Sequence, residues 1–89
     1  MAKAEISWKR VTEEGEKLQV YARPVGRVWH FFHRSKRFDQ WRQVEEPPLE
    51  DWMELLDALQ RLINRRRYQP NDEVLLRSQI RERFPESGV

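Results

Sequence analysis

The stretch KLQVYARPVGRVWHFFHR, residues 17–34, carries the pattern that determines the predicted fold. In residues 17–23 apolar and polar side chains alternate, which is typical of a half-buried β-strand. Residues 24–26, Pro-Val-Gly, are a turn signal, because proline fixes φ and glycine allows the chain to reverse. Residues 27–34 then predict another strand of the same antiparallel sheet.

The residues on either side extend this sheet. Residues 6–12 have mixed β character, and Gly15 after them supplies the positive φ that a tight hairpin needs. Three strands joined by short turns predict an antiparallel meander. In residues 35–46 the apolar positions are three apart, a spacing that fits a helical turn as well as a short fourth strand, so this segment has two interpretations.

The second half of the chain predicts two helices. Two consecutive prolines precede a strongly amphipathic helix over residues 48–67, whose last turn contains the run Arg65-Arg66-Arg67, matched to the helix dipole. Its apolar stripe consists of Leu49, Trp52, Met53, Leu55, Leu56, Leu59, Leu62 and Ile63. Residues 71–84 predict a second helix with Asn71 as its cap, followed by a flexible tail at 85–89.

Together these elements predict a single α+β domain over residues 1–89. A three- to four-stranded antiparallel β-meander within residues 5–46 is expected to precede the two C-terminal helices, which are packed on one face of the sheet. A chain of 89 residues has no length for a second core. A domain this small has modest stability, which self-association would increase.

The composition excludes several classes of protein. The absence of cysteine excludes disulfides, thiolate zinc sites and a cysteine nucleophile. No apolar leader and no long apolar window occur, so we expect neither a signal peptide nor a membrane span, and by elimination a cytoplasmic protein. The formal net charge is +2, but residues 23–42 carry six basic residues against Asp39, a local charge of +5.

The strand predicted at 27–34 carries aromatic side chains on both faces. One face has Val28, His30 and Phe32, and the other has Trp29, Phe31 and His33. Two helices that follow a sheet in sequence most easily cover one face, so one aromatic set is expected to point to solvent. We predict that Trp29 and Phe31 are the partly exposed set. The alternative is that both sets are buried by the helices or by a partner chain.

Aromatic and arginine side chains on one sheet face predict a binding function. Tryptophan and arginine are enriched where proteins meet, so we favour a non-enzymatic interaction module that binds a protein partner or a second copy of itself. The alternative is a single-stranded nucleic-acid-binding module that uses residues 27–42, since bases stack on rings and arginines pair with phosphates. The candidate binding residues are Tyr21, Arg23, Arg27, Trp29, Phe31, His33, Arg34, Lys36, Arg37 and Arg42.

Catalytic and metal functions are not expected. His30 and His33 point to opposite faces of a strand and cannot share a metal ion. The sequence has no nucleophile-elbow context and no glycine-rich phosphate loop, so it predicts no catalytic residue, no cofactor and no small-molecule substrate. A general acid–base pair of His33 with Asp39 or Glu45 has no motif to support it.

Overall fold

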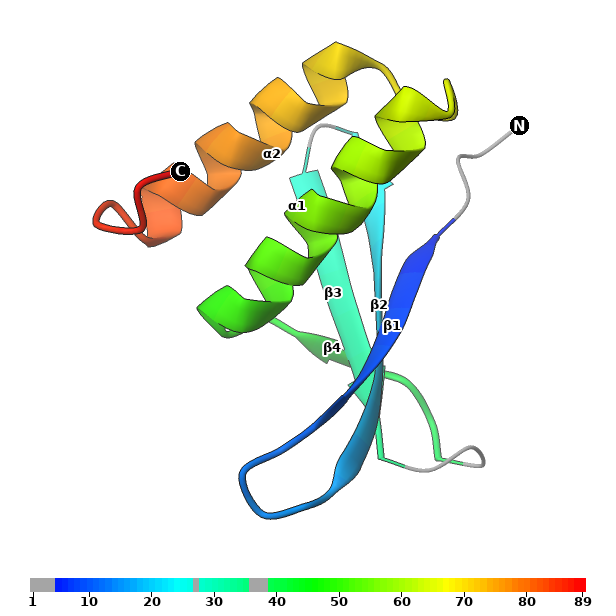
Figure 1. Ribbon diagram of the computed structural model, residues 1–89. Helices are drawn as coiled ribbons and strands as arrows, with labels where there is room; N and C mark the ends of the chain where they lie inside the picture. The colour runs from blue at the N-terminus through cyan, green and yellow to red at the C-terminus, as the bar shows by residue number, and fades with distance from the viewer. Residues whose placement is uncertain (1–4, 27, 36–38) are drawn as a thin grey trace. The chain divides into compact units, whose positions relative to one another are not determined.

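The structure is a computed structural model that describes residues 5–26, 28–35 and 39–89. Its elements are β1 (Ile6–Val11), β2 (Lys17–Val25), β3 (Val28–Arg34), β4 (Arg42–Val44), α1 (Leu49–Asn64) and α2 (Pro70–Arg83), shown in Figure 1. The strands form one four-stranded antiparallel sheet in the order β1-β2-β3-β4. The predicted α+β class, a meander followed by two helices, is confirmed.

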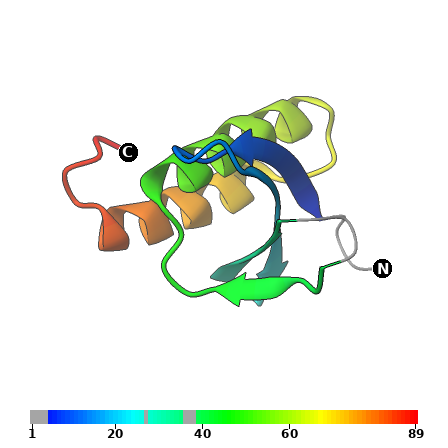
Figure 2. The same ribbon diagram turned by 90° about the horizontal axis from the view of Figure 1, so that it is seen from below.

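The chain divides into two compact units. The sheet unit consists of Met1–Val25 and Trp29–Glu46, and the helical unit consists of Gly26–Val28 and Pro47–Val89. Within the helical unit α1 and α2 lie side by side (Figures 1 and 2). The Gln60 side chain of α1 donates a hydrogen bond of 3.2 Å to the Glu73 carboxylate of α2, which joins the two helices.

β1 and β2 form the hairpin that the sequence predicts. Gly15 in the turn has a φ of +86°, the left-handed conformation expected of it. The register places Ile6 opposite Ala22 and Trp8 opposite Val20, so these four side chains share one side of the sheet. More buried and more exposed residues alternate along both strands, because successive side chains point to opposite sides.

β2 is longer than predicted. It continues to Val25, so the expectation that Pro24 and Val25 belong to a turn is wrong. The fixed φ of proline is compatible with an extended strand wherever its missing N–H is not needed. β1 begins at Ile6, opposite Ala22, so the ladder between β1 and β2 needs no donor at Pro24. The chain reversal includes Gly26, with a φ of +64°.

Residues 42–44 decide between the two interpretations of the segment 35–46. They form β4, which Figure 2 shows as a short green arrow beside β3. In the antiparallel register Phe31 lies opposite Val44 and His33 lies opposite Arg42. The fourth-strand interpretation is therefore confirmed, and this strand is short.

One side of the sheet is buried. Its buried residues are Ile6, Leu18, Val20, Ala22, Trp29 and Phe31. The prediction that Trp29 and Phe31 are partly exposed is wrong, because their exposed fractions are 5% and 1%. The Phe31 ring meets Trp8 edge to face, with centroids 6.2 Å apart, and Trp8 lies opposite Val20. Phe31 therefore lies on the side that carries the apolar row of β2, and Trp29, two residues away on β3, shares that side.

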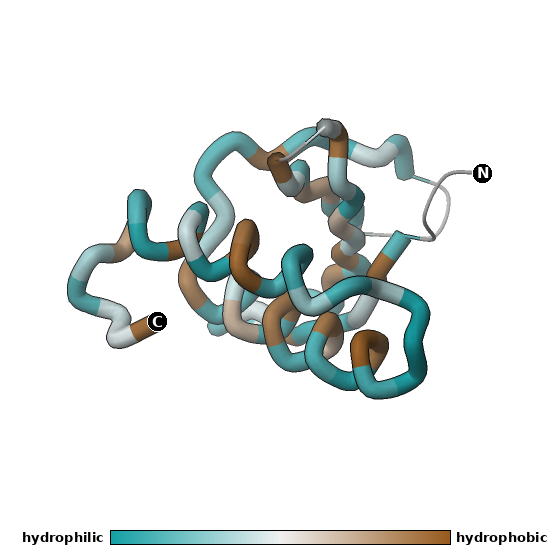
Figure 3. The backbone as a smooth tube through the Cα atoms, turned by 90° about the horizontal axis from the view of Figure 1, so that it is seen from above, coloured by the Kyte–Doolittle hydropathy of each residue, from teal (hydrophilic) through white to brown (hydrophobic). Residues whose placement is uncertain are grey.

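α1 buries an apolar stripe, and Figure 3 shows hydrophobic segments recurring between hydrophilic ones along the helices. The buried stripe residues are Trp52, Leu55, Leu56 and Leu59. Met53, which the predicted stripe included, is 40% exposed, because it is about 100° around the helix from its neighbour Trp52. The guanidinium carbon of Arg83 on α2 lies 5.4 Å from the centroid of the Trp52 ring, over its face.

α1 ends at Asn64 in a Schellman motif. The N–H of Arg67 donates to the Leu62 carbonyl and the N–H of Arg66 donates to the Ile63 carbonyl, both at 2.9 Å. These are the two hydrogen bonds that define the motif. In this motif the second residue after the helix has a left-handed backbone conformation, and glycine usually occupies that position. Here Arg66 adopts the conformation, with a φ of +62°. The arginine run therefore forms the cap that follows the helix rather than its last turn.

Replacing Arg66 by glycine is expected to raise the free energy of unfolding by about 0.5–1 kcal/mol, because glycine adopts the left-handed conformation without a Cβ clash. The greater freedom of glycine in the unfolded chain offsets part of the gain. Urea denaturation measures the change. Arg65→Gly is the matched control and should give no gain, since Arg65 has a φ of −92°. Equal gains from both variants would point to charge removal rather than backbone conformation.

α2 begins with a capping box, and its cap is Gln69 rather than the predicted Asn71. The backbone N–H of Gln69 donates to the Asp72 carboxylate at 2.8 Å, and the Gln69 side chain accepts from the backbone N–H of Asp72. Pro70 occupies the first helical position, where its missing N–H costs nothing. The helix therefore starts two residues earlier than a cap at Asn71 would allow.

Two groups of the helical unit have shifted pKa values. A hydrogen bond of 2.7 Å from Arg77 Nε, with a second from Gln60, lowers the pKa of the Glu73 carboxyl. The stability from this shift is present above the ordinary carboxyl pKa and is lost as the pH falls through the lowered value. Burial raises the pKa of the Tyr68 hydroxyl, and the charge of Asp72 adds to the effect.

The last residues form hydrogen bonds with α2 and with one another. Arg81 Nε donates to the backbone oxygen of Val89 at 2.8 Å, and the N–H of Ser87 donates to the Phe84 carbonyl at 3.0 Å. The flexibility expected of residues 85–89 stays a prediction.

Candidate functional site

The side of the sheet opposite the buried row carries polar and aromatic side chains, and we call it the open face. Its polar and aromatic residues include Lys9, Lys17, Gln19, Tyr21, Arg23, His30, Phe32, Arg34 and Gln43, and the exposed Ser7, Val11 and Val25 lie on the same side. The register places Lys9 opposite Gln19 and Phe32 opposite Gln43. Contact between Tyr21 and Phe32 joins the two halves of this face across β2 and β3.

Three rings form a continuous group on the open face, the aromatic cluster of Tyr21, Phe32 and Trp41. Tyr21 stacks on Phe32 with centroids 4.7 Å apart and ring planes at 12°. Trp41, which comes just before β4, meets Tyr21 edge to face, with centroids 4.7 Å apart and planes at 89°. Aromatic pairs of these kinds contribute about 0.5–1.5 kcal/mol each beyond their buried area, so the cluster maintains its own geometry.

An arginine lies over each end of the aromatic cluster. The guanidinium carbon of Arg23 is 5.4 Å from the centroid of Phe32, and that of Arg34 is 4.3 Å from the centroid of Trp41. Arg34 Nε also donates a hydrogen bond of 2.7 Å to the side-chain oxygen of Gln19. Because a guanidinium has five N–H donors, this contact orients Arg34 and leaves donors for a further acceptor.

The open face is positively charged. Its basic residues are Lys9, Lys17, Arg23 and Arg34. No carboxylate occurs among the strand residues of this face that the structure describes. A side-chain contact of 3.1 Å between His30 Nδ1 and the Gln43 amide adds a hydrogen-bonded polar pair. A surface with this charge attracts negatively charged partners.

The structure places part of the predicted binding set on the open face. Tyr21, Arg23 and Arg34 lie there, within or beside the aromatic cluster. Trp29 and Phe31, predicted as anchors of the same surface, are buried on the other side of the sheet. They cannot contact a partner at the open face, and their role is to form the core.

The remaining predicted residues lie elsewhere or are outside the described part of the chain. His33 and Arg42 lie opposite each other on β3 and β4, on the side that carries Phe31, and both line a cavity at the end of β3. Arg27, Lys36 and Arg37 lie outside the described residues. The predicted set therefore belongs to two separate surfaces of the sheet unit.

Phe32 and Trp41 are central to the site, but neither belongs to the predicted binding set. The length of the turn between β2 and β3 could have indicated that Phe32 lies beside Tyr21. A three-residue turn at 24–26 would place Tyr21 opposite Trp29, whereas strands that end at Val25 and restart at Val28 place Tyr21 beside Phe32. The longer turn was inferred because proline and glycine are both turn residues. Trp41 has no comparable signal, since it lies outside the strands.

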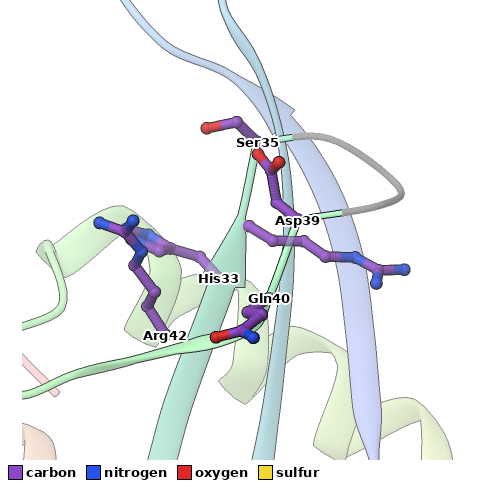
Figure 4. A pocket seen from close by; sticks show the side chains of 6 residues that line it. His33, Ser35, Asp39, Gln40 and Arg42 are labelled. Carbon is purple, nitrogen blue, oxygen red and sulfur yellow. The ribbon is translucent and has the colours of Figure 1, made fainter.

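Other kinds of site have little support in the described residues. Within that part of the chain, no three His, Asp or Glu side chains gather where a metal ion could bind, and no helix is long and apolar enough to cross a membrane. His33 and Asp39 line a common cavity, but Figure 4 shows the Asp39 carboxylate directed toward Ser35 and away from the imidazole. This arrangement does not form an acid–base pair.

No protein family matches the sequence, and no curated protein or solved structure matches the chain. The geometry and charge of the open face are therefore the basis for a function.

Proposed function

We propose that the protein is a small non-enzymatic interaction module whose open face binds an acidic segment of a protein partner. The observation that supports this proposal is the row in which the aromatic cluster is flanked by Arg23 and Arg34. Aromatic and arginine side chains contribute most of the binding energy at many protein interfaces. The planar guanidinium group pairs with a carboxylate through two parallel hydrogen bonds, which gives preference for acidic segments.

The orientation of the rings favours a protein over a nucleic acid. Bases bind by stacking on open ring faces. Here Tyr21 and Phe32 stack on each other, and guanidinium groups lie over Phe32 and Trp41. The cluster therefore presents ring edges and N–H groups, which suit the carboxylates, carbonyls and apolar side chains of a polypeptide.

The chain itself contains a segment of the required chemistry. The tip of the β1–β2 hairpin carries Glu13, Glu14 and Glu16, all of them exposed. A second copy could place this tip on the open face, and such an assembly would depend on protein concentration. We favour a different protein as the partner, and self-association is one outcome that the experiment below distinguishes.

A single-stranded nucleic acid is the second candidate partner. The local charge of +5 over residues 23–42 and the three rings on one sheet face support it. Bases would have to compete with the guanidinium groups of Arg23 and Arg34 for the ring faces that these groups cover. Release of counterions from the phosphates would make this binding weaken steeply as salt rises.

An NMR titration with three probes tests the proposal: a glutamate-rich peptide, its lysine-rich counterpart and a mixed-sequence single-stranded oligonucleotide, all at low salt. The acidic peptide should cause saturable shifts at Gln19, Tyr21, Phe32 and Trp41, and the lysine peptide should cause none. Arg34→Ala should weaken the acidic peptide about tenfold or more, since a hydrogen bond to a charged group contributes about 1.5–3 kcal/mol. Arg61→Ala is the control, because Arg61 is an arginine of α1 that pairs with Asp57 at 3.1 Å.

Three results would contradict the proposal. Open-face shifts with the oligonucleotide and none with the peptide would assign the face to nucleic acid. A dimer-sized tumbling time that Glu14→Lys abolishes would make a second copy the occupant. Equal losses of peptide binding in Arg34→Ala and Arg61→Ala would show that net charge, not the open face, attracts the peptide.

A further inference from the structure

A second basic group lies at the end of β3 and is not part of the open face. His33 and Arg42 are directly opposite each other in the register of β3 and β4, so their side chains lie on the same side of the sheet. Figure 4 shows the imidazole ring and the guanidinium group next to each other. Two basic side chains in directly opposed positions place their N–H groups at one end of the sheet, where an anion could accept from both.

These two side chains border a polar cavity of about 400 Å³. The cavity is lined by His33, Arg34, Ser35, Asp39, Gln40 and Arg42. Its volume falls within the range of about 300–1,000 Å³ that small-ligand sites occupy. Among the residues that the structure describes, the lining consists of hydrogen-bonding groups rather than the apolar side chains of a typical ligand pocket, so a small polar ion suits it better than an organic molecule.

We infer that this cavity binds a doubly charged tetrahedral oxyanion of the phosphate-monoester class. The fork of N–H donors on Arg42 matches the spacing of phosphate oxygens. The imidazole of His33 and the amide of Gln40 are further donors of the lining. A phosphate monoester presents three terminal oxygens to these donors, whereas a diester presents only two.

The two other charged residues of the lining leave this positive side available. The Arg34 guanidinium is held over Trp41, so it contributes positive potential rather than a direct contact. The Asp39 carboxylate is directed toward Ser35 and away from Arg42 in the view of Figure 4. Because Arg42 is exposed and His33 is half-buried, a bound ion stays partly hydrated, and we expect weak, salt-sensitive binding.

Titration with inorganic phosphate, monitored by NMR at constant pH and ionic strength, tests this inference. Saturable shifts are expected at Gln40 and Arg42 and at the imidazole C–H signals of His33. The imidazole of His30 is an internal reference, because it lies on the opposite side of the sheet next to Gln43. Phosphoserine and dimethyl phosphate distinguish a monoester from a diester, and phosphoserine should bind like inorganic phosphate if the natural source is a modified side chain.

Arg42→Gln should weaken phosphate binding about tenfold or more, since it removes charge-assisted hydrogen bonds. His33→Gln should weaken it less, and His30→Gln, the matched control on the same strand, should leave it unchanged. Dimethyl phosphate binding as tightly as phosphate, identical shifts with chloride, or an unchanged affinity in Arg42→Gln would each overturn the inference. The outcome is independent of the proposed function, because phosphate binding here does not require the open face to bind a peptide.

Discussion

Replacement of Phe31 by alanine is expected to lower the free energy of unfolding by about 3–5 kcal/mol, because it removes a fully buried ring and leaves a cavity. The Phe31 side chain is 1% exposed and contacts Trp8 edge to face. Small domains have a total stability of about 5 kcal/mol, so this variant should be largely unfolded at ambient temperature. Urea denaturation followed by tryptophan fluorescence measures the loss, and the milder Phe31→Leu keeps it measurable if the alanine variant does not fold.

The adjacent Phe32→Ala is the matched control and should cost only about 1–2 kcal/mol, from one aromatic pair and one cation–π contact. Phe32 is half-buried and contacts Tyr21 and Arg23 on the open face. Its removal should instead weaken binding of the acidic peptide, which Phe31→Leu should leave intact. Similar losses of stability in Phe31→Ala and Phe32→Ala would contradict the assignment of the two sheet faces.

Trp52→Ala in α1 is expected to cost about 3–5 kcal/mol, a loss as large as that for Phe31. Trp52 has no exposed surface, and Arg83 of α2 lies over its ring, so the substitution removes both packing and a contact between the helices. Thermal unfolding followed by circular dichroism measures the effect as a lower midpoint. The more conservative Trp52→Phe should give a smaller loss of the same sign.

Met53→Ala, one residue further along α1, provides the comparison. Met53 is 40% exposed, and alanine has the best helix propensity, so its replacement should change stability by no more than about 0.5 kcal/mol. A large loss from Met53→Ala would mean that the apolar stripe of α1 is wider than the buried residues indicate. In that case the broad stripe predicted from the sequence would be the better description.

The strand and helix pattern could be predicted because it depends on local periodicity. Leu18, Val20 and Ala22 alternate with polar residues, and this pattern alone identifies the buried side of β2. The aromatic residues of β3 lack such contrast, so the buried set is determined by the register between β2 and β3. That register depends on whether Pro24 and Val25 extend the strand, which shortens the predicted turn from three residues to two.

The helix ends were harder to predict because residues of several types, at neighbouring positions, can cap a helix. Asn71 has the better capping side chain, yet Pro70 starts the helix and makes Gln69 the cap. At the end of α1 the expected glycine is absent, and Arg66 takes its place at a positive φ. A sequence pattern identifies typical capping residues, whereas these two helix ends are capped by Gln69 and Arg66, which are not typical ones.

The types of residue in the candidate site could be predicted from the sequence, but not all of the individual residues. The sequence indicated aromatic and arginine side chains on an outer sheet face, and Tyr21, Arg23 and Arg34 are there. Trp41 joins them only because the chain returns from β3 to form β4, which brings residues distant in sequence together. Such a contact between a strand and a loop has no periodic signature.

The exposure of Trp41 makes part of the tryptophan fluorescence of the chain accessible to quenchers. Of the four tryptophans, Trp29 and Trp52 are buried and Trp8 is half-buried, while Trp41 is 37% exposed within the open face. A water-soluble quencher therefore reaches Trp41 more readily than the two buried indoles, and the guanidinium over its ring sets the local field that its excited state experiences. The most readily quenched part of the emission comes from Trp41 and reports on the open face without an attached dye, whereas the half-buried Trp8 contributes a less accessible part from the other side of the sheet.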